Sequence, residues 1–185
     1  MLTEEIKKEV FKINEYFRRQ DADKYDFWEN HIKFVVDESL KLAEAYGADK
    51  EIVEIGAMLH DIALMSRVGT KADHHVNGAK VAEEILDKFN IEENKKQRIL
   101  GCVLHHRTSK NAENLEELCV ADADILAHFD NIPMIFFKCY KLGNMTLENR
   151  EEMKQGFAKD FDDLSEKTKP VFEDRYNTIM DVLFR

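Results

Sequence analysis

The sequence is poor in the residues that interrupt helices. Only 2 prolines and 7 glycines occur among 185 residues, whereas hydrophobic residues make up 44% and charged residues 35% of the chain. Disordered chains contain fewer apolar residues, and all-β folds contain more turn residues. We therefore expect one all-α globular domain over residues 1–185, long enough to bury a core without disulfides.

Cysteine is also scarce and irregularly spaced. Cys102, Cys119 and Cys139 are odd in number, and no two of them form a Cys-x-x-Cys pair. This pattern argues against a disulfide framework and against a thiolate zinc site. We expect buried free thiols in a reducing compartment.

Positive charge is in deficit, and long apolar runs are absent. The formal net charge is −10, so nucleic acid is not an expected partner, because phosphate backbones bind to basic surfaces. A small anionic substrate in a locally basic pocket is compatible with this charge. The first ten residues are charged and amphipathic rather than a signal segment, and no apolar run approaches membrane length. We expect a cytoplasmic protein with no membrane partner.

Apolar residues recur at helical spacing along most of the chain. The expected helices cover about residues 3–19, 24–46, 49–64, 74–89, 91–106, 112–129, 132–142, 146–164 and 170–184. Gly143 and Asn144 separate a core of about residues 24–142 from a C-terminal helical extension of about residues 143–185. We expect the apolar stripes of this extension to pack on the core or to form a homodimer contact.

One apolar helix carries two adjacent ionisable residues. Residues 51–64 are apolar on all sides, which is typical of a core helix, and they include His60 and Asp61. Burial of a carboxylate beside an imidazole is costly unless its charge is offset, and a metal ion offsets it directly. The sequence therefore predicts a metal site at this pair.

Four helical segments direct histidines toward the same interior. The candidates are His31, His60, His74 or His75, and His105 or His106. Imidazole nitrogens combined with carboxylate oxygens suit Fe, Mn, Co, Ni or Zn better than Ca²⁺, and Mg²⁺ is a further candidate. Because a carboxylate beside His60 can bridge two ions, both a single ion and a binuclear centre remain open.

The segment predicted as a helix over residues 112–129 offers two further carboxylates, Asp122 and Asp124. One of them should be a ligand. Asp122 shares a helical stripe with Leu118, Ile125 and Phe129, so periodicity slightly favours Asp122.

The order His31, His60-Asp61 and Asp124 resembles the HD superfamily of metal-dependent phosphohydrolases, all-helical proteins named for their His-Asp pair. The resemblance covers roughly residues 30–129. Residues 57–62 (Ala-Met-Leu-His-Asp-Ile) are similar to the family signature. Residues 74–79 (His-His-Val-Asn-Gly-Ala) and 103–107 (Val-Leu-His-His-Arg) are similar to its secondary histidine motifs.

The resemblance implies a set of metal ligands. The late aspartate of such families stands in an Ala-Asp-x-Leu setting, which selects Asp124 over Asp122 against the periodicity. The first metal would be held by His31, His60, Asp61 and Asp124. A second metal would be held by His74 and by His105 or His106, with Asp61 as the bridge.

The resemblance also implies an activity. No Gly-Tyr-Pro follows His105-His106, and Phe27 stands where a further carboxylate would be expected, so the cyclic-dinucleotide phosphodiesterase branch is disfavoured. The expected reaction is hydrolysis of a phosphate ester or anhydride in a small molecule, with nucleotides as the favoured class, through a metal-activated water. The alternatives are a di-iron HD-type oxygenase and a non-catalytic metal-binding or ligand-binding sensor.

Residue roles follow from this reading. Asp61 and His106 are the predicted catalytic residues. The basic residues nearest to the predicted ligands are Arg67, Lys71 and Arg107, and they are the candidates for binding substrate phosphates.

Overall fold

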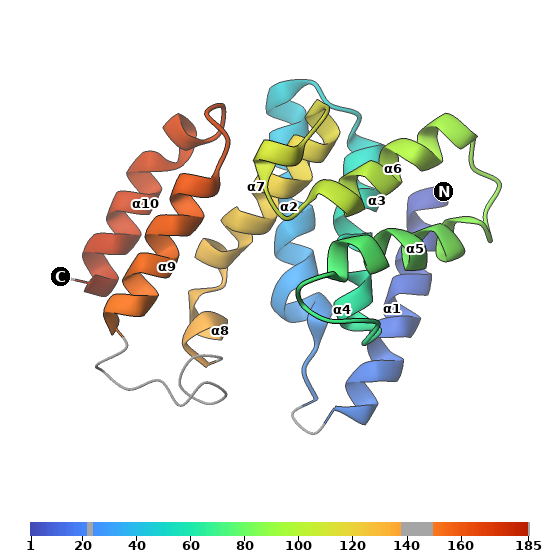
Figure 1. Ribbon diagram of the computed structural model, residues 1–185, viewed down its shortest axis with the longest axis horizontal. Helices are drawn as coiled ribbons and strands as arrows, with labels where there is room; N and C mark the ends of the chain where they lie inside the picture. The colour runs from blue at the N-terminus through green and yellow to red at the C-terminus, as the bar shows by residue number, and fades with distance from the viewer. Residues whose placement is uncertain (22–23, 138–149, 185) are drawn as a thin grey trace.

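The computed structural model describes residues 1–21, 24–137 and 150–184, and every regular element in these ranges is helical (Figure 1). The elements are α1 (Leu2–Gln20), a π-helical turn (Trp28–Ile32), α2 (Lys33–Tyr46), α3 (Lys50–Leu59), α4 (Ile62–Met65), α5 (His74–Leu86), α6 (Glu93–His105), a 3₁₀ turn (Ser109–Asn111), α7 (Leu115–Asp130), α8 (Ile132–Phe137), α9 (Arg150–Asp163) and α10 (Lys169–Phe184). The all-α prediction is confirmed. Within the described ranges, no helix combines the length and the apolar character needed to cross a bilayer.

The helix expected from residue 24 begins later than predicted. Residues 24–26 are not helical, and the side chain of Asp26 accepts hydrogen bonds from the Glu29 N–H (3.0 Å) and from the Asn14 amide of α1 (2.9 Å). Asp26 therefore acts where the helix begins, as short polar acceptors commonly do. The far end is as expected, because Gly47 follows α2 with a left-handed φ of 77°.

The predicted continuous helix over residues 49–64 is interrupted at its functional pair. Helix α3 ends at Leu59, and Asp61 has φ −105° and ψ 21° before the short α4 begins. The Ala57 carbonyl, which is the acceptor for the Asp61 N–H in a continuous helix, receives the Nδ1–H of His60 at 2.7 Å. The pair thus lies at a break between two buried helical segments.

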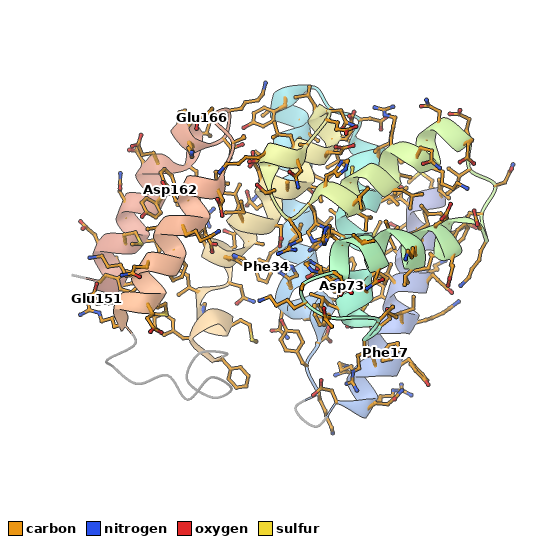
Figure 2. The ribbon with its side chains drawn as sticks, in the orientation of Figure 1. Phe17, Phe34, Asp73, Glu151, Asp162 and Glu166 are labelled. Carbon is orange, nitrogen blue, oxygen red and sulfur yellow. The ribbon has the colours of Figure 1, made fainter. Side chains whose placement is uncertain are left out.

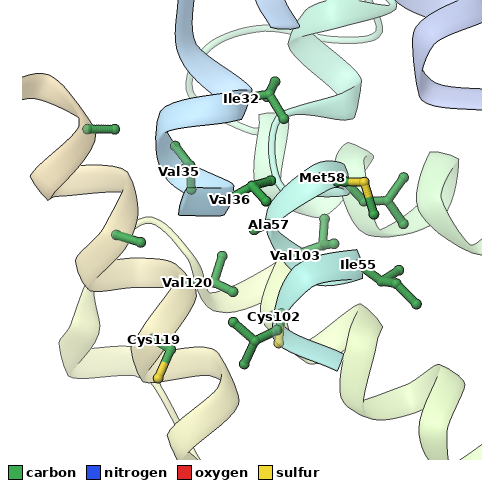
Figure 3. Close-up of a cluster of buried hydrophobic side chains, with 14 of the residues drawn as sticks. Ile32, Val35, Val36, Ile55, Ala57, Met58, Cys102, Val103, Cys119 and Val120 are labelled. Atoms are coloured by element: carbon green, nitrogen blue, oxygen red, sulfur yellow. The ribbon is translucent and has the colours of Figure 1, made fainter. Parts of the chain in front are cut away.

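Helices α2, α3, α6 and α7 enclose the core. Helix α2 packs along α7, α3 packs on both α2 and α6, and α5 packs on α6 (Figure 1). Figure 3 shows the side chains at this centre, among them Ile55, Met58, Val103 and Val120. Gly56 permits the close approach of α3 to α6, because a Cβ there would lie 2.5 Å from the Cβ of Cys102.

Two of the three cysteines confirm the expected free thiols. Cys102 and Cys119 are buried and form no disulfide. Burial raises the pKa of both thiols, to about 12 for Cys119. These groups are therefore packing residues rather than nucleophiles. Cys139 lies outside the described residues.

The C-terminal pair α9 and α10 packs against α7. Phe129 of α7 contacts Phe157 of α9 and Phe172 of α10, with ring centroids 5.2 Å and 5.0 Å apart, and all three rings are buried. The predicted apolar stripes therefore pack on the core of their own chain. Figure 2 shows the exposed acidic side chains of Glu151 and Asp162 on α9 and of Glu166 in the connection to α10. The proposed boundary at Gly143 and Asn144 lies outside the described residues.

Candidate metal centre

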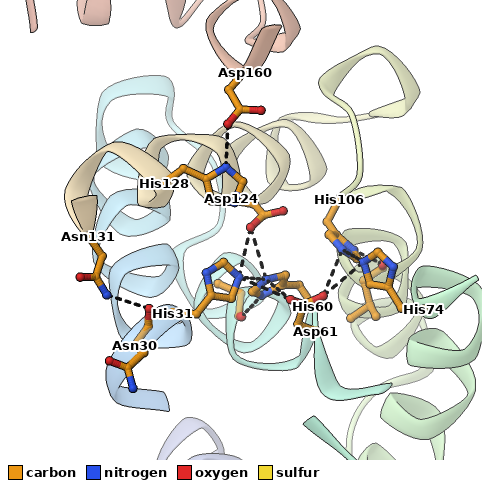
Figure 4. A network of polar contacts seen from close by, with 12 residues as sticks. Asn30, His31, His60, Asp61, His74, His106, Asp124, His128, Asn131 and Asp160 are labelled. Atoms are coloured by element: carbon orange, nitrogen blue, oxygen red, sulfur yellow. Dashed lines mark hydrogen bonds and ion pairs between the residues drawn. The ribbon is translucent and has the colours of Figure 1, made fainter. Parts of the chain in front are cut away.

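Six histidine and aspartate side chains cluster at one pocket (Figure 4), where five of them line the cavity and His60 is fully buried beside it. They form two groups, in each of which the ligand atoms lie within 4.8 Å of one another: His31, His60 and Asp124, and Asp61, His74 and His106. The first group joins the π-helical turn, the end of α3 and helix α7. The second joins the α3–α4 junction, the first residue of α5 and the residue after α6.

Backbone carbonyls orient three of these imidazole rings. The Nδ1 donors and their acceptors are His60 and Ala57 O (2.7 Å), His74 and Lys71 O (2.8 Å), and His106 and Val103 O (2.7 Å). Because each Nδ1 carries the hydrogen, Nε2 of each neutral ring offers a lone pair. This second bond to Nδ1 is the usual way in which a protein fixes a metal-binding histidine.

The Nε2 atoms of these three rings and of His31 face one another across short gaps. Nε2 of His74 lies 2.9 Å from Nε2 of His106, and Nε2 of His31 lies 3.1 Å from Nε2 of His60. Two ligand nitrogens bound at about 2.1 Å to one ion, at a right angle, are also about 3 Å apart. The spacing of each pair therefore fits a shared cation.

Asp61 lies between the two groups. Its Oδ2 is 3.4 Å from Nε2 of His31, and its Oδ1 is 3.2 Å from Nε2 of His74. Oδ1 is buried and has no hydrogen-bond partner among the residues that the structure describes. A buried carboxylate oxygen without a donor is costly, and a cation compensates for it. The residues present thus fit a metal ion in each group, and Asp61, a member of the second group, also lies within 3.4 Å of His31 of the first.

Electrostatics in the pocket favour ionised carboxylates. Burial raises the pKa of Asp61 and of Asp124, but the surrounding histidines outweigh burial and hold both values below the ordinary range. Burial lowers the pKa of His60 to about 4. At His31 burial acts in the same direction, yet hydrogen bonds to Asp124 and Asp61 raise its pKa to about 9. Both carboxylates are therefore ionised at neutral pH, which is the form in which they bind a metal ion.

The structure distinguishes between the neighbouring candidates. His105 lies outside both groups, because its Nδ1 donates to Oε2 of Glu117 at 2.8 Å, whereas the next residue, His106, lies inside. His75 likewise belongs to neither group. Successive residues on a helix point about 100° apart, so only one member of each His-His pair reaches the pocket.

Asp122 is buried away from the site, although periodicity favoured it. Its carboxylate accepts hydrogen bonds from the Ser165 N–H (2.9 Å), the Ser165 hydroxyl (2.5 Å) and the Thr168 hydroxyl (2.6 Å). Asp122 thereby anchors the connection between α9 and α10 to α7. Asp124, which the resemblance selected, lies in the first group.

The three predicted phosphate-binding cations separate into two sets. Lys71 and Arg107 line the pocket that contains the histidines, a cavity of about 270 Å³. Arg67 instead donates to Asp21 (3.3 Å) and to the Phe17 carbonyl (3.4 Å), and it lines a neighbouring cavity. The structure thus brings two of the three to the site.

His128 is a pocket residue that the sequence reasoning left without a role. Its ring stacks near that of His31, with centroids 6.3 Å apart and planes inclined by 25°, and its Nδ1 donates to Oδ2 of Asp160 at 3.0 Å (Figure 4). The available signal was its position four residues after Asp124, which places both on one helix face. No comparable spacing indicated Asp160 as the partner of His128, because Asp160 lies on a different helix, α9.

Comparison with known proteins agrees with this geometry. The family model described as the HD domain matches residues 28–128. Over its whole fold the chain is similar to an HD-superfamily hydrolase from Bacillus thuringiensis, with a TM-score of 0.72 at 20% identity, covering 99% of this chain and 95% of the other. It is also similar to a predicted HD superfamily hydrolase from an uncultured Thermotogales bacterium, with a TM-score of 0.66 at 21% identity and coverages of 95% and 88%.

Two relatives are similar in sequence. A tRNA (cytidine(56)-2'-O)-methyltransferase of Picrophilus torridus is 28% identical over 172 residues, covering 80% of this chain. The chain spans 47% of that methyltransferase. An uncharacterized protein of Clostridium beijerinckii is 25% identical over 122 residues, covering 57% of this chain and 78% of that protein. The family model covers more than half of the chain and includes every residue of the two ligand groups. The chain belongs to the HD-domain family.

Proposed function

We propose that this protein is a metal-dependent phosphohydrolase that cleaves a phosphate ester or anhydride in a small molecule, with nucleotides as the substrate class. The observation that carries the proposal is the set of imidazole nitrogens that face one another around Asp61, above all Nε2 of His74 and Nε2 of His106 at 2.9 Å. The donors are nitrogens and oxygens without a thiolate, a set that suits Fe, Mn, Co, Ni or Zn, with Mg²⁺ as the least suited to imidazole. One or two such ions would activate a water molecule and neutralise charge that develops on the phosphate.

The chain's own residues supply orientation and charge. Lys71 and Arg107 line the same cavity as the ligands, so their cationic groups would bind the phosphate oxygens that face away from the metal. The Arg107 guanidinium is oriented by a bond from Nη1 to the Ala72 carbonyl at 2.8 Å, which leaves its other donors for the substrate. Asp61 and His106 are the proposed catalytic residues, since both would touch the metal that acts on the phosphate.

The size of the cavity supports a small substrate. About 270 Å³ lies near the lower end of the range for small-molecule pockets, which favours a substrate about the size of a mononucleotide. The net charge of −10 likewise favours a small molecule over nucleic acid.

The test is hydrolysis by protein of known metal content. Protein stripped with a chelator is reloaded separately with Mn²⁺, Fe²⁺, Co²⁺, Ni²⁺, Zn²⁺ or Mg²⁺ and assayed for phosphate release from p-nitrophenyl phosphate, nucleotides and dinucleoside polyphosphates, with and without dioxygen. We expect metal-dependent hydrolysis that proceeds anaerobically. Turnover that requires iron and dioxygen would instead identify a di-iron oxygenase, and metal binding without any turnover would identify a sensor.

A further inference from the structure

The pocket has two chemically different ends. The cations that line it, Lys71 and Arg107, lie in the sequence beside His74 and His106, at the end formed by α5 and α6. The other end is formed by α7, α8 and the segment before α2. Among the described residues it is lined by uncharged amides, apolar side chains and one imidazole: Phe27, Asn30, Ala127, His128, Asn131 and Met134. The first end suits phosphate, and the second suits an uncharged group that offers hydrogen bonds and an apolar face.

The amides at the second end are oriented by the backbone. Asn131 donates from its side chain to the Asn30 carbonyl at 2.9 Å, and Asn30 donates from its side chain to the Asp26 carbonyl at 2.8 Å. Both side chains lie in the wall of the cavity. This end is therefore a structured surface rather than an accidental opening.

The imidazole of His128 is held by a carboxylate on the side away from the metal ligands. Its Nδ1 donates to Asp160, as Figure 4 shows, and its side chain is 41% exposed. Because Asp160 takes the Nδ1–H, the nitrogen left for the pocket is Nε2, which in the neutral ring is an acceptor. An acceptor pairs with a hydroxyl or N–H donor and not with a phosphoryl oxygen.

We propose that His128, positioned by Asp160, binds a sugar hydroxyl of the nucleotide, and that this contact favours nucleotides that carry the 2′- and 3′-hydroxyls over those that lack them. This assignment rests on the proposed function. A phosphate held between the ligand groups and the Lys71 and Arg107 end leaves the sugar to extend toward the α7 end, where the acceptor nitrogen lies. His128 is thus a substrate-binding residue, and Asp160 is a positioning residue.

The C-terminal pair of helices is what delivers Asp160 to the site. Asp160 lies on α9, beyond residues 28–128 that the HD-domain model matches. Helix α9 is fixed at this end by the bonds of Ser165 to Asp122 and by a bond from the Ser109 hydroxyl to the Asp163 carbonyl at 2.8 Å. The extension therefore contributes to substrate selection and not only to packing.

Equilibrium binding separates this assignment from the proposed function. The probes are the four common ribonucleoside 5′-monophosphates and their 2′,3′-dideoxy counterparts, titrated calorimetrically into Mn²⁺-loaded protein. His128→Phe retains an aromatic ring and removes both nitrogens, Asp160→Ala removes the orienting carboxylate, and Asp162→Ala on the same helix is the matched control because Asp162 is exposed (Figure 2). Thermal unfolding by circular dichroism checks that each variant is folded.

We expect the unmodified protein to bind at least one ribonucleotide about tenfold more tightly than its dideoxy counterpart, which is the usual effect of one hydrogen bond in a polar site. The preference should disappear in His128→Phe and Asp160→Ala and persist in Asp162→Ala. In Asp160→Ala, ¹⁵N NMR should also show a change in the tautomer of the His128 ring, which reports that Asp160 orients the ring, whereas the loss of the hydroxyl preference reports the contact with the substrate.

Three outcomes would overturn the assignment: no preference for the hydroxyl, the same preference in all variants, or no binding of any probe. Hydrolysis of p-nitrophenyl phosphate, which has no sugar, reports the proposed function separately. If p-nitrophenyl phosphate is cleaved while the ribose preference is absent, only the sugar contact is wrong.

Discussion

Nε2 of His74 and Nε2 of His106 lie 2.9 Å apart, and each ring donates its Nδ1–H to a backbone carbonyl. With both Nδ1 atoms bonded to carbonyls, two Nε2 atoms at this distance repel each other unless a proton or a metal ion lies between them. The pair is therefore arranged to bind a cation.

Replacement of either ring should remove one ion and leave the other group of ligands intact. We expect His74→Ala and His106→Ala to lose one bound ion per chain and at least about 100-fold in phosphohydrolase activity, since two-metal sites act as a unit. Mass-spectrometric metal analysis beside an activity assay measures both. His105→Ala is the control, because His105 pairs with Glu117. Equal metal loss in His105→Ala and His106→Ala would contradict the assignment.

Substitution of Asp124 should affect metal binding, whereas substitution of Asp122, on the same helix α7, should affect stability. Asp124→Ala should lose metal and activity. Asp122→Ala should keep its metal but unfold more easily, by about 2–4 kcal/mol, because three donors from Ser165 and Thr168 lose their buried acceptor. Urea denaturation and metal analysis of both variants test this. The opposite pattern would show that periodicity, and not the resemblance, identified the ligand.

Substitutions of the three predicted phosphate-binding cations should differ in their effect on kcat/KM. Lys71→Ala and Arg107→Ala should each reduce kcat/KM about tenfold or more while metal content is unchanged, because each removes a charged contact to phosphate. Arg67→Ala should change kcat/KM less than about twofold, since its guanidinium pairs with Asp21 beside a different cavity. A loss at Arg67 as large as that at Lys71 would place the phosphate elsewhere.

The metal-free protein should lose stability as the pH rises above neutrality. Asp124 and Asp61 raise the pKa of His31 to about 9 in the folded state, above its ordinary value of 6.5. A raised pKa stabilises the folded state fully below pH 6.5, and this contribution is lost as the pH rises through about 9. We therefore expect the Tm in EDTA to fall between pH 6.5 and pH 9.

The control for this pH dependence is His31→Gln, in which the decline attributable to this group should vanish. The lowered pKa values of Asp61 and Asp124 do not contribute within this window, because both groups stay ionised. At pH 7.5, metal binding should displace the proton of His31, and calorimetry in buffers of different ionisation enthalpy would detect its release. A Tm that rises between pH 6.5 and pH 9 would be inconsistent with the charge arrangement.

The close approach of α3 and α6 can be tested with a single methyl group. Gly56→Ala places a Cβ 2.5 Å from the Cβ of Cys102, so we expect destabilisation by about 1–3 kcal/mol. Gly156→Ala in α9 has nothing within 4 Å and should stabilise by about 0.5–1 kcal/mol through helix propensity. Denaturant midpoints of the two variants should move in opposite directions.

Helical content could be predicted from the sequence because apolar periodicity and capping are local properties. The late start of the second helical segment could not, since it depends on a tertiary bond between Asp26 and Asn14 of α1. The break at His60 and Asp61 was also hidden, because apolar residues continue on both sides of it. Periodicity reports which face of a helix is buried and does not report its contacts.

Because periodicity reports burial and not contacts, it also failed to identify the correct aspartate of the site. Periodicity favoured Asp122, and Asp122 is indeed buried, but its partners are hydroxyls that come from a distant connection. The motif resemblance selected Asp124, and the structure places it beside His31 and His60. Asp160 could not be linked to His128 from the sequence, because only the docking of α9 brings them together.

Asp61 lies between the two ligand groups, so the most direct test of the proposed metal-dependent hydrolase is its replacement. Metal content and phosphate release are measured together on purified Asp61→Ala and on the unmodified protein after identical reloading with Mn²⁺. We predict that the variant is folded, retains less than one ion per chain and has no measurable hydrolysis. A variant that is fully metallated and active would contradict the account.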